Sequence, residues 1–101
     1  MPGYAYVWEF EVAASRQEEF ERRYGPEGPW MELFSLDPGY IGSSLLQDRA
    51  NPLRYVTIDR WASEESFHAF RARYAARYEA LDKSCEELTT SERSLGALRS
   101  G

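Results

Sequence analysis

Two side chains in this sequence have the chemistry of a general base, Asp59 and His68, and both belong to one stretch, residues 53–81. His68 is the only histidine, and imidazole is the side chain whose unperturbed pKa lies nearest neutrality. Asp59 lies in LRYVTIDRW, where strand alternation places it on one face with Tyr55 and Trp61. A carboxylate among aromatic rings has a raised pKa, which suits it to accept a proton near neutral pH. Asp59 and His68 are therefore the candidate catalytic residues.

Each of these residues also has a structural interpretation that the sequence leaves open. Asp59 could form a salt bridge with an arginine instead of facing a ligand. His68 follows Phe67 at the margin of an inward helical stripe, where a histidine serves equally well in packing or at the surface. Trp61 could floor a ligand cavity or anchor a helix to the sheet. Tyr74 could offer its hydroxyl to a ligand or belong to the core stripe.

Composition and charge limit the partners of the chain. Its 101 residues predict one domain, 1–101, and a content of 43% hydrophobic and 15% aromatic residues predicts a globular one. The net charge is −5, and the lysine and arginine residues are scattered among acids without a basic run. We therefore expect neither nucleic acid nor a membrane surface as a partner.

Neither a membrane span nor a signal peptide is expected. No apolar stretch approaches the roughly 20 residues of a membrane span. The first residues, MPGYAYVWEF, lack a basic start followed by a long apolar block. Cys85 is the only cysteine, which excludes an internal disulfide and a cysteine-based metal site, and no basic neighbour activates it. These features predict a cytoplasmic protein without a metal site.

Hydrophobic periodicity predicts the elements that must position the candidate residues. Alternation predicts strands over 4–12, 40–47 and 53–61, and CEELTTSER predicts a weaker strand over 85–93, followed by a tail. Ser15 with Glu18 has the pattern of a capping box at the start of a first helix. WMELFSL predicts one or two helical turns, and Ser63 is expected to cap a long helix that reaches Leu81.

This order of elements is the ferredoxin-like βαββαβ plan, an α+β fold with a four-stranded antiparallel sheet and its helices on one face. The plan leaves the other face of the sheet open. Val56 and Ile58 lie on the face opposite Tyr55 and Trp61, so both faces of the third strand carry apolar residues. A sheet face in contact with water would alternate more cleanly. We therefore expect a second copy of the chain to cover this face in a homodimer.

Five segments carry a resemblance to a known family: YVWEFEV, FERRYGPEGPW with the LF that follows, DPGYIGSSLLQD, RYVTIDRW and FHAF. Together they resemble the dimeric α/β-barrel superfamily and, within it, the antibiotic biosynthesis monooxygenase type of domain. The resemblance covers nearly the whole chain, about 4–96. The superfamily includes cofactor-independent oxygenases, haem-degrading enzymes, small-molecule isomerases and many proteins without known activity, so the fold alone does not fix the activity.

The resemblance implies a cavity between the sheet and the helices, and an oxidative chemistry that needs no cofactor. A base would remove a proton from a small aromatic or polyketide-type molecule, the carbanion would pass an electron to O₂, and apolar walls would shield the intermediates. Asp59 and His68 are the candidate bases. The expected substrate-binding residues are Trp61, Tyr55, Trp8 and Tyr74.

The chain departs from the family's active-site patterns at three positions. Polyketide-modifying members have an amide side chain on the third strand and a tyrosine early in the second long helix, where this chain has Thr57 and Phe67; only Trp61 is kept. Haem-degrading members have a histidine ten residues beyond that tryptophan, where this chain has Arg71. Two hypotheses follow: a cofactor-independent monooxygenase, or a non-catalytic dimeric domain that binds a small apolar or aromatic molecule or acts as an accessory subunit.

Overall fold

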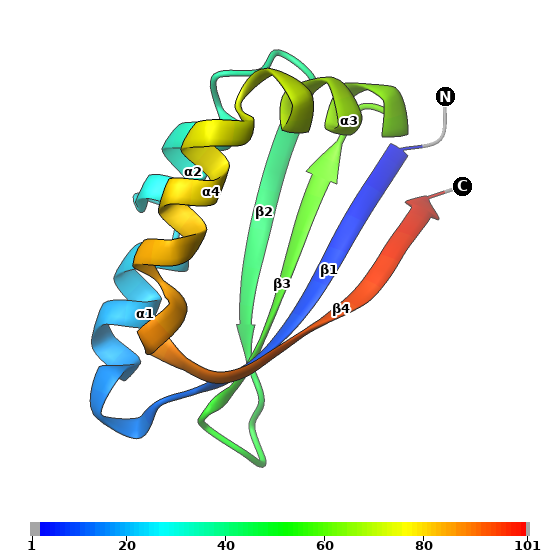
Figure 1. Cartoon of the computed structure of the whole chain (residues 1–101). Helices are drawn as coiled ribbons and strands as arrows, with labels where there is room; N and C mark the ends of the chain where they lie inside the picture. The colour runs from blue at the N-terminus through cyan, green and yellow to red at the C-terminus, as the bar shows by residue number, and fades with distance from the viewer. Residues whose placement is uncertain (1–2, 101) are drawn as a thin grey trace.

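A four-stranded antiparallel sheet, with all its helices on one face, makes up the structure, a computed structural model that describes residues 3–100. The strand order is β2-β3-β1-β4, as the ferredoxin-like plan requires (Figure 1). The strands are β1 (Gly3–Val12), β2 (Tyr40–Gln47), β3 (Arg54–Trp61) and β4 (Thr89–Ser100). The helices are α1 (Gln17–Tyr24), α2 (Pro29–Phe34), α3 (Glu64–Arg73) and α4 (Ala75–Ser84), with short 3₁₀ turns at Ala14–Arg16 and Glu86–Leu88. The predicted fold is confirmed.

The pairing of β1 with β3 sets which side chains face the helices. In this antiparallel register Tyr6 lies opposite Asp59, and Trp8 lies opposite Thr57. Because directly paired residues share a face, all four side chains lie on the helix side of the sheet. The predicted alternation of the third strand is confirmed, since Tyr55, Thr57, Asp59 and Trp61 are its buried residues.

Ser63 begins α3 as predicted, whereas Ser15 does not begin α1. The Ser63 side chain accepts a hydrogen bond from the backbone N–H of Ser66, and the first turn of α3 is acidic. Ser15 instead lies inside the 3₁₀ turn Ala14–Arg16, and α1 starts at Gln17 without a side-chain cap. The predicted capping box is therefore wrong, because the chain makes one tighter turn before α1 begins.

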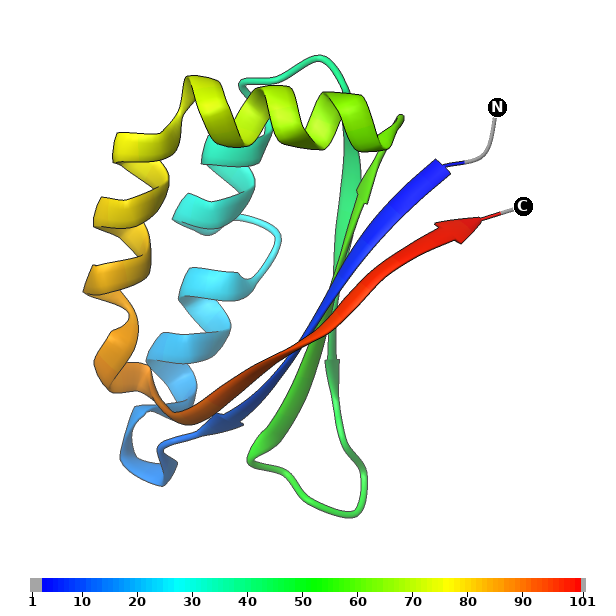
Figure 2. The same cartoon turned by 45° about the vertical axis from the view of Figure 1, so that its right-hand side comes forward.

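The long helix predicted from Ser63 to Leu81 is divided in two at Tyr74. Tyr74 has φ −112° and ψ 25°, outside the helical region, and it ends α3 while preceding α4. Figure 2 shows the result: α3 runs across one end of the sheet, and α4 then turns to run down along the helix-covered face of the sheet, at the left of the view. Without this bend, the residues of α4 could not face the middle of the sheet.

The last strand is longer, and begins later, than predicted. Residues 86–88 form a 3₁₀ turn, and β4 then pairs with β1 as far as Ser100, so the predicted tail is part of the sheet. The register shifts at Leu95, and the next residue, Gly96, has φ 96°, a conformation that glycine adopts without strain. The polar sequence of this strand follows from its position at the edge of the sheet.

The face of the sheet away from the helices carries exposed apolar side chains. Ile41 is 64% exposed, Leu46 50% and Leu98 58%, and Val56 and Ile58 are half-buried beside them. No element of the described chain covers this face (Figure 2). No helix within residues 3–100 is long and apolar enough to cross a bilayer.

Candidate functional site

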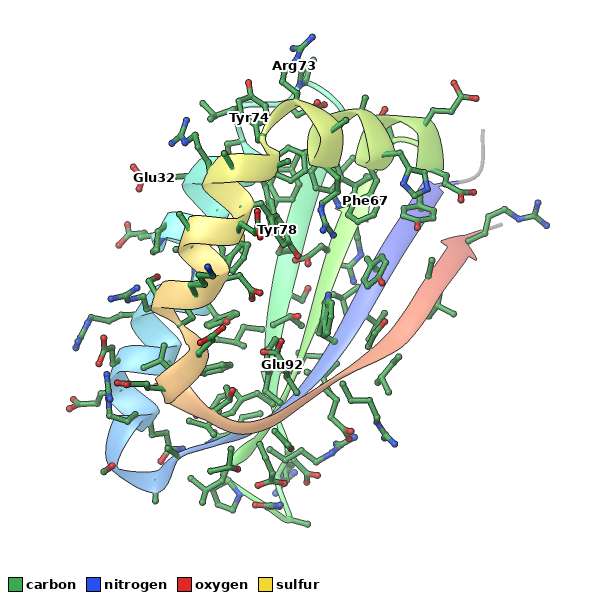
Figure 3. The ribbon with its side chains drawn as sticks, viewed as in Figure 1. Glu32, Phe67, Arg73, Tyr74, Tyr78 and Glu92 are labelled. Carbon is green, nitrogen blue, oxygen red and sulfur yellow. The ribbon has the colours of Figure 1, made fainter. Side chains whose placement is uncertain are left out.

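A cavity of about 290 Å³ lies between the sheet and the helices. It is bounded by strands β1, β3 and β4 on one side and by α1, α2, α3 and α4 on the other. Figure 3 shows Tyr78 projecting from α4 toward the sheet and Glu92 projecting from β4 into the same space. Its lining combines aromatic, apolar and charged side chains: Tyr6, Trp8, Phe10, Tyr24, Trp30, Met31, Phe34, Thr57, Asp59, Arg71, Tyr78, Asp82 and Glu92.

Aromatic rings form most of the cavity wall, and they contact one another. Tyr6 and Trp8 stack on β1 with ring centroids 5.8 Å apart. Across the cavity, Trp30 and Tyr78 pack edge to face at 5.0 Å and join α2 to α4. Such a wall favours a flat, apolar molecule of limited size.

Asp59 is the buried acid of this cavity. Its side chain is 9% exposed, and Ser43 of β2 donates a 2.7 Å hydrogen bond to Oδ1. The hydroxyls of Ser43 and Tyr40 lie 2.6 Å apart. Burial raises the pKa of Asp59 to about 6, while the hydrogen bond from Ser43 and the charge of Arg60 oppose that rise. A carboxyl group with this pKa gains and loses a proton close to neutral pH.

Arg71 is the basic residue among the lining side chains. Its guanidinium carbon lies 4.0 Å from the ring centroid of Tyr78, a cation–π contact. Burial raises the pKa of Tyr78 to about 12, and the charge of Arg71 opposes that rise. Tyr78 therefore keeps its proton at neutral pH and is a hydrogen-bond donor at the cavity wall.

Asp82 of α4 and Glu92 of β4 complete the charged lining. Burial raises the pKa of both carboxyl groups, and each also lies in the negative field of Glu86. The charge of Asp82 further raises the pKa of Glu92, whereas the charge of Arg71 opposes the rise in the pKa of Asp82. Residues 3–100 contain no group of three or more His, Cys, Asp and Glu side chains arranged to hold a metal ion.

Two of the six predicted site residues, Asp59 and Trp8, line the cavity. Trp61 is fully buried beneath it, in contact with Phe34 and Phe70 at centroid distances of 5.6 and 4.9 Å. These contacts pack α2 and α3 against the sheet. Tyr55 is also buried and receives a hydrogen bond from Gln17.

The other two predicted residues lie on α3 and at its end, outside the cavity lining. His68 is 63% exposed and lies 3.3 Å from the carboxylate of Glu64, one turn away. Tyr74 is at the bend between α3 and α4 (Figure 3), with its ring 5.5 Å from Phe70. The geometry thus favours Asp59 over His68 as the group that meets a ligand.

Arg71, Asp82 and Glu92 were not among the predicted site residues. Asp82 comes four residues after Tyr78, which in turn comes seven after Arg71, so helical spacing offered a signal for this face. The predicted helix ended at Leu81, so Asp82 lay one residue beyond it, whereas α4 continues to Ser84. Glu92 alternates with its neighbours on a polar strand, and only the pairing of β4 with β1 shows that it lies opposite Phe10 on the cavity side.

Comparison with known proteins identifies a family whose fold agrees with the one observed. The family model described as "Antibiotic biosynthesis monooxygenase" matches residues 4–78. The search of curated proteins gave no match.

Several solved structures share the fold. SnoaB, a cofactor-independent oxygenase from Streptomyces nogalater, is 21% identical with a TM-score of 0.71 over 97% of this chain and 92% of that chain. A conserved protein from Methanosarcina mazei Go1 is 15% identical with a TM-score of 0.75 over 100% and 95% of the two chains. A protein from Shewanella oneidensis is 16% identical with a TM-score of 0.72 over 97% and 90%. At these identities the likeness shows the fold alone.

Proposed function

This chain belongs to the antibiotic biosynthesis monooxygenase family, and on that premise we propose that it is a cofactor-independent oxygenase acting on a small, electron-rich aromatic molecule. The substrate binds in the cavity between the sheet and the helices, against Trp8 and the other rings of the wall. O₂ is the second substrate. The description of SnoaB as a cofactor-independent oxygenase supports this reaction class.

The observation that carries the proposal is the position of Asp59. It is a buried carboxyl group in an aromatic cavity, with Oδ1 bound by Ser43 and with a pKa near 6. At neutral pH most of it is ionised, and Oδ2, which accepts no hydrogen bond within residues 3–100, would take a proton from the substrate. A base whose pKa lies near the working pH transfers protons efficiently in both directions.

The proposed reaction balances without a cofactor. Asp59 takes a proton from an acidic C–H group of the substrate, and the carbanion passes one electron to O₂. The substrate radical and superoxide combine to form a carbon–oxygen bond, and the peroxide takes the proton back from Asp59. The hydroperoxide then loses water, with cleavage of its O–O bond and loss of the second hydrogen on that carbon, which leaves a ketone. The substrate is oxidised, and one oxygen atom of O₂ leaves as water.

Arg71 and Tyr78 would stabilise the negative charge that develops on the substrate. Arg71 supplies a guanidinium group at the cavity, and Tyr78 supplies a hydroxyl that stays protonated. Fixed donors and charges of this kind are worth more where water is excluded. The family resemblance leads us to expect an amide and a tyrosine side chain at positions 57 and 67, where this chain has Thr57 and Phe67. Arg71 and Tyr78 would stabilise the negative charge in place of those side chains.

The remaining candidate residues either support the wall of the cavity or lie outside the cavity. Trp61 and Tyr55 lie beneath the wall and hold it in place, and Tyr74 holds the bend that turns α4 toward the cavity. His68, exposed and next to Glu64, takes no part in the proton transfer. It therefore provides a control for Asp59.

We also propose a homodimer, formed by the face of the sheet away from the helices. Ile41, Leu46 and Leu98 are each at least half exposed there, and contiguous apolar surface of this kind marks an interaction site. A two-fold axis would pair the face with itself.

Oxygen uptake with a panel of hydroquinones and anthrones tests the function. We expect uptake above the uncatalysed rate with at least one compound, loss of that activity in Asp59→Asn, and little change in His68→Ala. No uptake by the native chain across the panel would reject the oxygenase. Saturable binding of the same compounds without uptake would favour a non-catalytic binding domain.

A further inference from the structure

Strand β2 has one extra residue beside the candidate base. Ser43 lies opposite Asp59 in the pairing of β2 with β3. Tyr40 lies opposite Trp61, because the register shifts at Ile41. In a regular strand, side chains three residues apart point to opposite faces, so the sheet would separate Tyr40 from Ser43. The bulge returns Tyr40 to the helix side, next to Ser43, and bulges re-aim side chains in this way beside active sites.

The hydroxyl of Tyr40 continues the hydrogen bonding of Asp59. Ser43 Oγ donates to Oδ1 of Asp59 at 2.7 Å, and the Tyr40 hydroxyl lies 2.6 Å from Ser43 Oγ. Met31 Sδ, 3.0 Å from the same hydroxyl, is a second acceptor, but thioether sulfur accepts weakly. A carboxylate only accepts, so the proton of Ser43 is committed to Asp59 and Tyr40 donates to Ser43.

Packing fixes the Tyr40 ring, and with it the position of the hydroxyl. The ring centroid lies 5.4 Å from that of Phe34 and 5.2 Å from that of Trp61, in tilted and edge-to-face contacts. A serine hydroxyl rotates, but one that accepts a bond from a fixed donor has its own proton directed elsewhere. Tyr40 therefore directs the proton of Ser43 at Oδ1. Neither of these two residues is part of the cavity lining, so both reach a ligand only through Asp59.

We propose that Tyr40 is a positioning residue for Asp59: through Ser43 it keeps a donor on Oδ1, which holds the carboxylate in one orientation and leaves Oδ2 to take the proton of the substrate. Hydrogen bonds in series strengthen one another, and both of these favour the ionised carboxylate. The inference rests on the proposed function in taking Asp59 as the base. It adds to that function a residue that acts on the base without touching the substrate.

Other ionisable groups lie around Asp59, and a test of Tyr40 must leave them in place. They come from β1, β3, β4, α3 and α4: Tyr6, Arg60, Arg71, Tyr78, Asp82 and Glu92. Burial raises the pKa of Tyr40 itself, so its hydroxyl keeps its proton near neutral pH. Substitutions at Tyr40 and Ser43 thus remove hydroxyls and no charge, and the charges around Asp59 stay the same.

A double-mutant cycle on the pKa of Asp59 tests the inference without any substrate. ¹³C NMR follows the carboxyl resonance that Asp59→Asn removes, in the native chain, Tyr40→Phe, Ser43→Ala and the double variant. Tyr40→Phe should raise the pKa of Asp59 by about 0.3 or more, since the bond from Ser43 loses its cooperative partner. In the Ser43→Ala background the same substitution should change that pKa by less than about 0.1, because the connection is already broken.

Further variants separate this coupling from general effects of substitution. Ser43→Thr keeps a hydroxyl at position 43, so Tyr40→Phe should again raise the pKa of Asp59 in that background. Tyr74→Phe removes a tyrosine hydroxyl at the bend between α3 and α4, outside the cavity lining, and should leave the pKa of Asp59 unchanged. Circular dichroism checks folding. Ser43→Val introduces a strand-forming residue without a hydroxyl, and it replaces Ser43→Ala if the double variant does not fold.

Oxygen uptake shows whether the coupling acts in the reaction. With the most active compound of the panel, Tyr40→Phe should move the pH midpoint of kcat/KM upward together with the pKa of Asp59, because this midpoint reports the free enzyme. KM above the midpoint should stay nearly the same, since Tyr40 is not part of the cavity lining.

The inference would be overturned by a pKa that Tyr40→Phe leaves unchanged, or by a rise of equal size in the Ser43→Ala background. A moved pKa beside an unmoved pH midpoint would also overturn it. Coupling in the NMR cycle without oxygen uptake would uphold the link from Tyr40 to Asp59 and reject only the oxygenase. Uptake that depends on Asp59, without the coupling, would leave only the oxygenase.

Discussion

Ser43 Oγ donates a 2.7 Å hydrogen bond to Oδ1 of Asp59, and so joins β2 to β3 beside the cavity. The hydroxyl of Tyr40 lies 2.6 Å from Ser43 Oγ and 3.0 Å from Met31 Sδ. Because the one hydroxyl proton of Ser43 is directed at Asp59, the shorter contact requires Tyr40 to be the donor to Ser43. The two hydroxyls therefore form a donor chain that ends on the carboxylate. This chain stabilises the ionised form of Asp59 and leaves Oδ2 for a ligand.

Replacement of Ser43 by alanine should raise the pKa of Asp59 above its value of about 6. The hydrogen bond from Ser43 favours the charged form, and its loss leaves burial less opposed. A ¹³C NMR titration of the aspartate carboxyl groups measures the change. Ser44→Ala is the control, because Ser44 contacts Arg60 on the other face of the sheet. A pKa that stays the same or falls in Ser43→Ala would show that the bond does not govern this group.

Asp59→Asn should stabilise the protein at pH 8 and have little effect at pH 4 or below. The pKa of Asp59 is raised from 3.8 to about 6 on folding, so the folded state binds a proton that the unfolded state releases between these values. The native chain therefore loses stability as pH rises through this window, by about 3 kcal/mol for a shift of this size. Asparagine carries no charge and escapes that loss.

Urea unfolding at several pH values measures the difference between Asp59→Asn and the native chain. The gain in unfolding free energy should grow from pH 4 to 6 and then level off. A gain that is the same at pH 4 and pH 8 would point to packing rather than to the buried charge.

Ser63→Ala should lower the free energy of unfolding by about 1 kcal/mol, because it leaves the N–H of Ser66 without its cap. Ser15→Ala is the matched control, since Ser15 lies exposed in a 3₁₀ turn and caps no helix. Its effect should be within about 0.5 kcal/mol of zero. Equal losses in the two variants would contradict the assignment of the cap.

The native chain should behave as a dimer of twice its 11.7 kDa in light scattering at micromolar concentration. Ile41→Arg, which places a charge on the proposed interface, should convert it to a monomer. Leu36 is 45% exposed on the helix side of the molecule, so Leu36→Arg is the control and should remain dimeric. A native chain that scatters as a monomer would rule out the proposed interface.

Local sequence patterns correctly predicted features that depend on neighbouring residues alone, such as the buried face of β3 and the cap of α3. The alternation around Asp59 gave the correct face of β3, and the Ser63 cap was identified because its bond spans only three residues. Ser15 and Glu18 have the spacing of a capping box, but Ser15 does not cap a helix in the structure. A capping box requires the chain to enter the helix directly, and the 3₁₀ turn before α1 prevents this.

The lining of the cavity depends on tertiary contacts that short sequence patterns do not predict. The bend at Tyr74 turns α4 toward the sheet, and it occurs within a sequence that is helical throughout by periodicity. Asp82 and Glu92 approach each other only because β4 pairs with β1 along its whole length. The acidic lining is therefore a property of tertiary structure, and two of its three acids, Asp82 and Glu92, were not predicted from the sequence.

The pH dependence of oxygen uptake, measured for the native chain and Asp59→Asn with the most active compound of the panel, tests the central claim most directly. If Asp59 is the base, uptake by the native chain should rise with pH through a midpoint near 6, where the carboxyl group ionises. Asp59→Asn should lose about a hundredfold or more of the activity together with that midpoint. Asp59→Asn with native activity, or with an unchanged midpoint, would contradict the account.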